Sequence, residues 1–220
     1  TESGQPITTI VNYACHPTTL AWDNTLISPD YPGAMREVVE EVTKAPCFFI
    51  QGASGDIGPR DGFTGDVAVA DRNGRQLGYA VLSALESMPP ASTALQYTGA
   101  VVSGATIGTW QFADTDDQRQ SDTAAWNHLV TSCEIPYRDD LPDRAELQRE
   151  RSEWLAKQDA AIESGDASAA ADARAMAERM TRRLVRVEHL PQAATLPYAV
   201  QIWKLGDAIW LALDGELYNV

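Results

Sequence analysis

The chain has 220 residues, and its 17 lysines and arginines against 31 aspartates and glutamates leave a formal net charge of −14. Nucleic-acid binding ordinarily requires a basic face, and anionic membrane surfaces repel an acidic chain, so both classes of partner are disfavoured. Hydrophobic residues make up 44% and charged residues 22% of the sequence, a composition typical of folded globular proteins. No apolar run approaches the roughly 20 residues that a membrane-spanning helix needs.

The cysteines and the two ends of the chain bear on where the protein works. Cys15, Cys47 and Cys133 form an odd set without a CxxC pair, so we expect neither a disulfide framework nor a thiolate zinc site. Three cysteines still allow one isolated disulfide, so the redox compartment is left open. The chain starts at Thr1 without a methionine and stops at Val220 near an apolar stretch. We interpret it as a piece of a longer protein, so the lack of a signal peptide excludes nothing.

The first part of the chain predicts alternating strands and helices. Residues 7–14 are rich in β-branched and aromatic side chains and predict a strand, which a polar loop over 17–31 follows. Pro32 suits the first position of a helix, and apolar residues then recur at helical spacing. Residues 47–50 predict a short strand buried on both faces, and the glycine-rich segment 51–66 predicts a loop.

The second part of the chain differs in composition. A helix is expected over about 71–87, strand-forming residues follow over 95–110, and residues 111–125 are polar enough to predict an exposed loop. Residues 143–187 are rich in Ala, Arg, Glu and Leu, and a Ser-Gly-Asp turn in their middle predicts a helical hairpin. Residues 197–213 predict two strands joined by a Gly-Asp turn.

These elements predict an α/β fold in which a mixed β-sheet is flanked by helices. We expect residues 1–220 to form part of one domain, with the helical hairpin, residues 141–190, inserted within it. The insertion is interpreted as a solvated embellishment, and a partner-binding or lid role is the alternative.

Functional residues in such folds gather in loops beyond the ends of strands. Two polar loops, 15–31 and 51–70, leave strands and enter helices, and the segment 214–216 follows the last apolar stretch. The side chains there that suit a zinc or hard-cation site are those of His16, Asp30, Asp56 and Glu216. Alone, each has a simpler explanation, since a histidine before a proline is more often structural. The glycine loop lacks the Gly-Lys-Ser/Thr ending of a phosphate-binding loop, which disfavours nucleotides.

Three short blocks occur in a distinctive order. The first block runs from His16-Pro17-Thr18 through Asn24-Thr25-Leu26-Ile27-Ser28 to Asp30 and Gly33. The second is Gly55-Asp56-Ile57-Gly58-Pro59, and the third is Gly215-Glu216-Leu217. In this order the blocks resemble those of the neutral, non-lysosomal ceramidases, in which the second reads Gly-Asp-Val-Ser-Pro and the third Gly-Glu-Phe. The first block keeps the spacing from histidine to aspartate of that family.

The resemblance implies a zinc-dependent amidase that cleaves the carbon–nitrogen bond of N-acyl sphingoid amides. Its zinc is held by two histidines, a glutamate and a tyrosine, of which His16 matches the second histidine and Glu216 the glutamate. The first histidine would precede Thr1 and the tyrosine would follow Val220. We therefore expect weak or no zinc binding by this chain alone. The family is commonly secreted or membrane-associated, which implies an extracytoplasmic location.

The second block departs from the family. Gly58 stands where the family has a serine assigned to the reaction, so no catalytic residue is transferred, and Arg60 replaces the asparagine usual after the proline. A zinc-activated water would still suit amide hydrolysis, with backbone N–H groups of the glycine loop facing the developing oxyanion. The residues expected to contact substrate are Ser54, Gly55, Asp56, Gly58 and Arg60.

The main hypothesis is a zinc-dependent amidohydrolase of ceramidase type, acting on a lipid amide in sphingolipid metabolism. Because Gly58 breaks the family pattern, a related metal hydrolase acting on another amide or an ester stays open. A non-catalytic family member, whose helical hairpin and acidic surface bind a partner, is the third hypothesis. The sequence leaves the substrate and the oligomeric state open.

Overall fold

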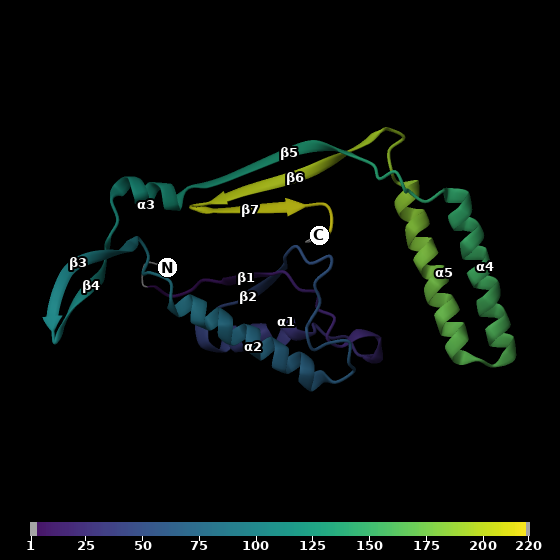
Figure 1. Cartoon of the computed structure of the whole chain (residues 1–220), viewed down its shortest axis with the longest axis horizontal. Coiled ribbons are helices and arrows are strands. Elements are labelled where there is room, and N and C mark those ends of the chain that lie inside the picture. The colour runs from purple at the N-terminus through teal and green to yellow at the C-terminus, as the bar shows by residue number, and fades with distance from the viewer. Residues whose placement is uncertain (1–3, 219–220) are drawn as a thin grey trace. The chain divides into compact units, whose positions relative to one another are not determined.

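The computed structural model describes residues 4–218, apart from the side chain of Asp23, and it has the predicted α/β character, with small sheets and accompanying helices (Figure 1). The chain divides into two compact units, Thr1–Asn127 with Trp203–Val220, and His128–Ile202. In chain order the elements are β1 (Thr9–Tyr13), η1 (Ala21–Asp23), α1 (Tyr31–Thr43), β2 (Cys47–Gln51), α2 (Val67–Glu86), β3 (Thr93–Ser103), β4 (Ala105–Asp114), α3 (Asp117–Ala124), β5 (Trp126–Pro136), α4 (Arg144–Ser164), α5 (Ala167–Glu188), β6 (Thr195–Leu205) and β7 (Ala208–Leu213).

Strands β1 and β2 form a parallel pair, and α1 connects them in the strand–helix–strand order that the sequence predicts. Their register runs from Thr9 opposite Cys47 to Tyr13 opposite Gln51. Because the two strands point the same way, their carboxyl ends lie at one edge, and the loops that follow them start side by side. This edge positions the candidate site described below.

The core of this unit lies between the β1–β2 pair and α1. Met35 and Val39, four residues apart on α1, are completely buried and cluster with Val11 of β1 and Cys47 of β2. Among the described residues the other face of the pair is uncovered, since the Phe48 side chain remains 58% exposed. The expectation that residues 47–50 are buried on both faces is therefore wrong for this structure, because helices cover one face only.

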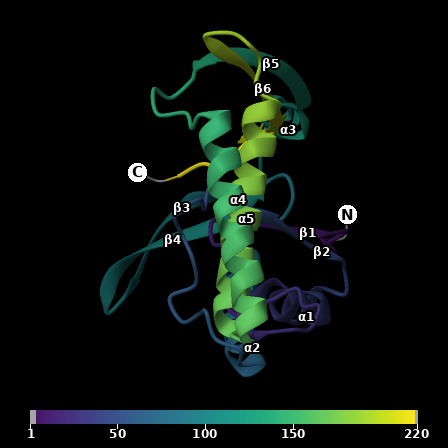
Figure 2. The same cartoon turned by 90° about the vertical axis from the view of Figure 1, so that its right-hand side faces the viewer.

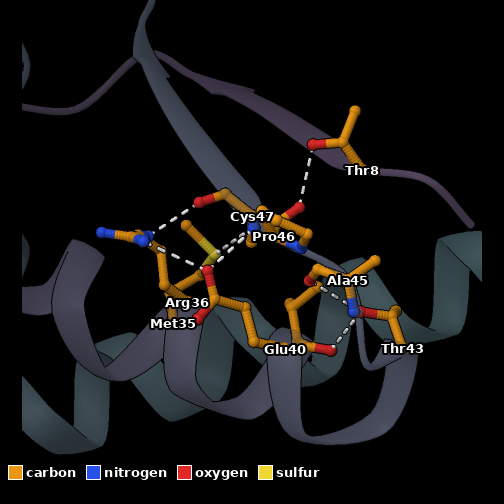
Figure 3. A network of polar contacts seen from close by, with 9 residues as sticks. Thr8, Met35, Arg36, Glu40, Thr43, Ala45, Pro46 and Cys47 are labelled. Atoms are coloured by element: carbon orange, nitrogen blue, oxygen red, sulfur yellow. Dashed lines mark hydrogen bonds and ion pairs between the residues drawn. The ribbon is translucent and has the colours of Figure 1, made fainter.

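Polar side chains fasten the turn between α1 and β2 (Figure 3). The Arg36 Nε donates a hydrogen bond to the Cys47 carbonyl at 2.7 Å, and the Cys47 N–H donates to Glu40 Oε1 at 2.8 Å. Arg36 and Glu40, one helical turn apart, form an ion pair at 3.1 Å. The Thr8 hydroxyl donates to the Pro46 carbonyl at 2.9 Å from the β1 side. The start of β2 is thus fixed by both neighbouring elements.

The region after α2 corrects the sequence analysis. Strands β3 and β4 form an antiparallel hairpin, so the residues expected as strand material over 95–110 make two strands. Residues 111–125 are not a loop, because β4 continues to Asp114 and the Asp116 side chain then caps α3 by accepting from the Arg119 N–H at 2.7 Å. Strand β5 was not predicted. All of its residues are exposed, so burial imposes no alternating pattern on its sequence.

Two antiparallel helices, α4 and α5, form the expected hairpin and lie side by side in both views (Figures 1 and 2). The Asp143 carboxylate caps α4 by accepting from the Glu146 N–H, and Asp166 caps α5 by accepting from the Ala169 N–H, each at 2.9 Å. The hairpin belongs to the His128–Ile202 unit. Strands β5, β6 and β7 are hydrogen-bonded in that order. Within residues 4–218 no helix combines the length and apolarity needed to cross a bilayer.

Candidate metal site

The loops that follow β1 and β2 are joined by backbone hydrogen bonds. The Gly52 N–H donates to the Tyr13 carbonyl at 3.0 Å, and the His16 N–H donates to the Ile57 carbonyl at 2.9 Å. Because the two strands are parallel and in register, the residues just beyond their ends face one another. This places His16 against the glycine-rich loop, as the sequence-based prediction requires.

A third segment from the far end of the chain joins this edge. The Gly55 N–H donates to the Leu217 carbonyl at 2.8 Å. A Cβ built on Gly55 would lie 2.6 Å from Cδ2 of Tyr218 and 2.9 Å from the Leu217 oxygen, closer than real Cβ contacts. Only glycine lets residues 215–218 approach the loop this closely.

His16 and Glu216 meet as a consequence. The His16 Nε2 lies 2.6 Å from Glu216 Oε1, with the two side chains 33% and 53% exposed. The other ring nitrogen, Nδ1, lies 3.1 Å from the Ile57 carbonyl oxygen. These acceptors raise the pKa of His16 above its ordinary value, the Ile57 carbonyl first and the Glu216 carboxylate next, against the opposing effect of burial. As an imidazolium, His16 donates to both partners at once.

The same geometry suits a metal ligand. The Ile57 carbonyl can only accept, so Nδ1 keeps its proton in the neutral ring and the Nε2 lone pair faces Glu216. An imidazole nitrogen and a carboxylate oxygen are both common zinc ligands. Two such ligands stand about 3.3 Å apart around a tetrahedral zinc ion. The observed 2.6 Å is shorter and therefore describes a hydrogen-bonded pair, and the two groups would have to move apart to hold an ion between them.

The donor set fits zinc in kind but is incomplete in number. Across residues 4–218 no group of three or more His, Cys, Asp or Glu side chains is placed to hold a metal ion. His16 and Glu216 would supply two of the four ligands that a structural or catalytic tetrahedral zinc uses, water included. The predicted histidine and tyrosine ligands lie outside the described residues.

Asp30 does not join the site. Its carboxylate accepts from the Leu20 N–H at 2.9 Å and from the Tyr31 N–H at 2.7 Å, and its own N–H donates to the Ser28 hydroxyl at 3.0 Å. The side chain is buried and caps α1 while folding the preceding loop onto it. The expectation that Asp30 shares a rim with His16 is replaced by this structural role. Asp56, also expected there, is exposed on the glycine-rich loop.

The residues expected to contact substrate divide into two groups. Ser54 is only 1% exposed, and its hydroxyl accepts a hydrogen bond from the Gln51 side chain, so it holds the loop from inside. Gly55 is the contact point for residues 217 and 218. The residues on the accessible side of the loop are Asp56, Gly58 and Arg60.

Two of the loop N–H groups expected to face an oxyanion are already used in backbone hydrogen bonds. Gly55 donates to Leu217, and the Ile57 N–H donates to the Ser54 carbonyl at 2.9 Å. The N–H of Gly58 makes no hydrogen bond within the described part of the chain. The Gly58 N–H, at the position where the family serine would stand, is therefore one loop donor left for an oxyanion.

Two positioning residues were missed by the sequence analysis. The Tyr31 hydroxyl donates to the Cys15 carbonyl at 2.6 Å, and the Gln51 side-chain amide donates to the same oxygen at 3.1 Å. Burial is the main cause that raises the pKa of Tyr31, which therefore remains a donor. Together they fix the peptide that carries His16. Their positions, at the start of a helix and the end of a strand, carry no sequence signal for this role.

No protein-family model, curated protein or solved structure matches the chain.

Proposed function

We propose that the chain forms part of a zinc-dependent hydrolase of the neutral ceramidase type, which cleaves the carbon–nitrogen bond of an N-acyl amide. One observation carries the proposal. The His16 Nε2 and Glu216 Oε1 atoms, from opposite ends of the chain, lie 2.6 Å apart. These are the two residues that the resemblance matches to zinc ligands, and the order of the motifs along the chain does not by itself require them to meet.

His16 and Glu216 would hold the ion through Nε2 and a carboxylate oxygen. A bound zinc polarises an amide carbonyl and makes water a stronger acid at neutral pH. The Ile57 carbonyl keeps the proton of His16 on Nδ1, which leaves Nε2 as the ligand atom. Tyr31 and Gln51 restrain the preceding peptide, and the Gly58 N–H is one loop donor available to a negatively charged oxygen.

A related hydrolase with a different amide or ester substrate is the second candidate. Gly58 offers no hydroxyl at the position of the family serine, and Arg60 places a cation where the family has a neutral amide. Both differences fall on the accessible side of the loop, where they would change substrate contacts and leave the ligand pair intact.

The test is zinc analysis and hydrolysis by the protein expressed from its complete gene, with N-acylsphingosine, other N-acyl amides and short esters as substrates. We expect about one zinc per chain and metal-dependent hydrolysis of an amide. His16→Ala should lose the zinc and lower kcat/KM more than about 100-fold, since loss of a hydrogen-bond partner of a ligand alone typically costs 10–100-fold. His189→Ala, at an exposed histidine of the His128–Ile202 unit, is the control.

Retention of stoichiometric zinc and full hydrolysis by His16→Ala would refute the assignment. Preference for esters over every amide would favour the second candidate. Zinc bound through His16 without hydrolysis of any substrate would favour the non-catalytic hypothesis.

A further inference from the structure

A cavity of about 750 Å³ adjoins the loop that holds His16. Its volume lies within the range of about 300–1,000 Å³ typical of small-molecule sites. The cavity is bounded by β1, α1, α2 and the loop that follows Gly58. Its lining residues include Tyr13, Tyr31, Arg60, Asp61, Arg72 and Leu77.

One of the two arginine side chains that line the cavity has no ion-pair partner within the part of the chain that the structure describes. Arg72 is paired with Asp61. Arg60 makes no ion pair or hydrogen bond among the described residues, and its side chain is exposed. The chain as a whole carries a formal net charge of −14. A chain with this net charge repels anions, so an unpaired guanidinium at a cavity creates a local region that attracts them.

Part of the cavity wall is apolar, and the rest is polar, with Gln76, Asn73 and the Arg72–Asp61 pair. Tyr31 presents its ring, because its hydroxyl is used by the Cys15 carbonyl. Leu77 and Ala80 extend this surface along α2, and Tyr13 closes it from β1. The Asn73 side-chain amide donates to the Asp61 carbonyl at 2.8 Å, which anchors the loop that carries Arg60. A hydrocarbon chain matches the apolar part of this wall, and a single negative group matches Arg60.

The cavity and the candidate metal site are formed by neighbouring residues of the same two loops. Cys15 lines the cavity and directly precedes His16 in the chain. Arg60 also lines the cavity, and it lies three residues after Ile57, whose carbonyl orients the His16 imidazole. We propose that the cavity binds an N-acyl amino acid, with hydrocarbon against the apolar part of the wall and the carboxylate paired with Arg60. This inference rests on the proposed function. It names as substrates amides that carry a negative charge, in place of the neutral N-acyl sphingoid amides that the resemblance implies.

Direct binding tests the cavity without requiring turnover. Calorimetry of the 220-residue chain would compare N-lauroylglycine with N-lauroylethanolamine, which has the same acyl chain and a neutral end, below the concentrations at which either forms micelles. We expect the carboxylate to bind about tenfold more tightly, the effect of one charge-assisted hydrogen bond. Arg60→Gln should remove that preference and leave the affinity for the neutral compound unchanged. Arg75→Gln, at an exposed arginine of α2 outside the cavity, should preserve it.

Equal affinity for the two compounds, absence of binding, or an equal loss of affinity in both arginine variants would overturn the inference. Its failure is distinguishable from failure of the proposed function. Selective binding of N-lauroylglycine that depends on Arg60, in a protein that hydrolyses no amide, supports the cavity and refutes the hydrolase. Zinc-dependent hydrolysis without preference for the carboxylate supports the hydrolase and refutes the cavity.

Discussion

Gly74 of α2 lies against the backbone of Tyr31 in α1, so closely that a Cβ on Gly74 would stand 2.3 Å from the Tyr31 carbonyl oxygen. Gly78, one turn further along α2, makes a similar approach to Val38. These two glycines let the helices pack at short distance, and α1 in turn covers the strands whose ends carry the candidate site. Helix packing and site geometry are therefore linked through Tyr31.

Gly74→Ala should destabilise the protein by about 1–3 kcal/mol, the usual cost of overpacking a closely packed contact. Alanine favours a helix over glycine by up to about 1 kcal/mol, but the clash is with backbone, which cannot rotate away. Urea unfolding measures the difference. Ser83→Ala, at an exposed position of α2, should change the unfolding free energy by less than about 0.5 kcal/mol. A stabilising effect of Gly74→Ala would contradict this helix packing.

Gly55→Ala should separate Glu216 from His16 without unfolding the chain. The new methyl group would occupy the space of the Tyr218 ring and the Leu217 carbonyl, so residues 215–218 must move away from the loop. NMR should show the pKa of His16 falling toward its ordinary value as the carboxylate withdraws. Gly58→Ala is the matched control, because its Cβ would find no atom closer than 3.8 Å. An unchanged His16 titration in Gly55→Ala would contradict the contact.

Gly58→Ser should fold and be more stable than Gly58→Ala by about 0.5–1.5 kcal/mol, the net contribution of one hydrogen bond. The Thr18 hydroxyl is buried without a hydrogen-bond partner among the described residues, and it lies 3.8 Å from the Cβ position of Gly58. A serine hydroxyl there can reach it. Thermal or urea unfolding of the two variants gives the comparison, and equal stability would show that the hydroxyls do not meet.

Glu216→Gln should lower the pKa of His16 and leave it partly raised, because the Ile57 carbonyl remains as the larger cause. Because the pKa of His16 is higher in the folded chain than in the unfolded chain, protonation of His16 stabilises the fold. This stabilisation is present in full at pH values below the unfolded-state pKa near 6.5, and it is lost as the pH rises through the folded-state pKa. Without metal, Glu216→Gln should therefore destabilise the chain more at pH 5.5 than at pH 8.5. NMR titration and urea unfolding provide the measurements. Asp214→Asn removes a carboxylate two residues from Glu216 and is the charge control, and it should leave the pKa of His16 unchanged.

Glu40→Gln should destabilise the protein at neutral pH, with the effect shrinking in acid. The Cys47 N–H lowers the pKa of Glu40 below its ordinary 4.5, and Arg36 lowers it further. A carboxyl group whose pKa is lower in the folded chain stabilises the fold at pH values above its unfolded-state pKa. That stabilisation is lost as the pH falls through the folded-state pKa. Urea midpoints at pH 7 and pH 3 should show the two proteins converging in acid. Glu41→Gln, at an exposed neighbouring carboxylate, controls for net charge, and parallel pH profiles of wild type and Glu40→Gln would contradict the network.

The local elements around the candidate site were predictable because burial leaves a periodic trace in the sequence. Met35 and Val39 recur at helical spacing, and they are the residues that α1 buries against the strands. The hairpin of α4 and α5 was predictable from its content of Ala, Arg, Glu and Leu and from the Ser-Gly-Asp turn at residues 164–166. Strand β5 was not, because its exposed residues have no buried face to impose an alternation.

Sequence by itself determined which chemical groups are present and the local elements on which they stand, since helix periodicity, caps and turns depend on neighbours along the chain. Only the tertiary structure decided which groups meet. Asp30 and Glu216 are both carboxylates in expected blocks, yet backbone N–H groups occupy the first while the second reaches His16. That outcome depends on the parallel register of β1 with β2 and on the close approach of residues 217 and 218 to Gly55. Such long-range contacts are set by packing and backbone hydrogen bonding between distant segments, which no local pattern encodes.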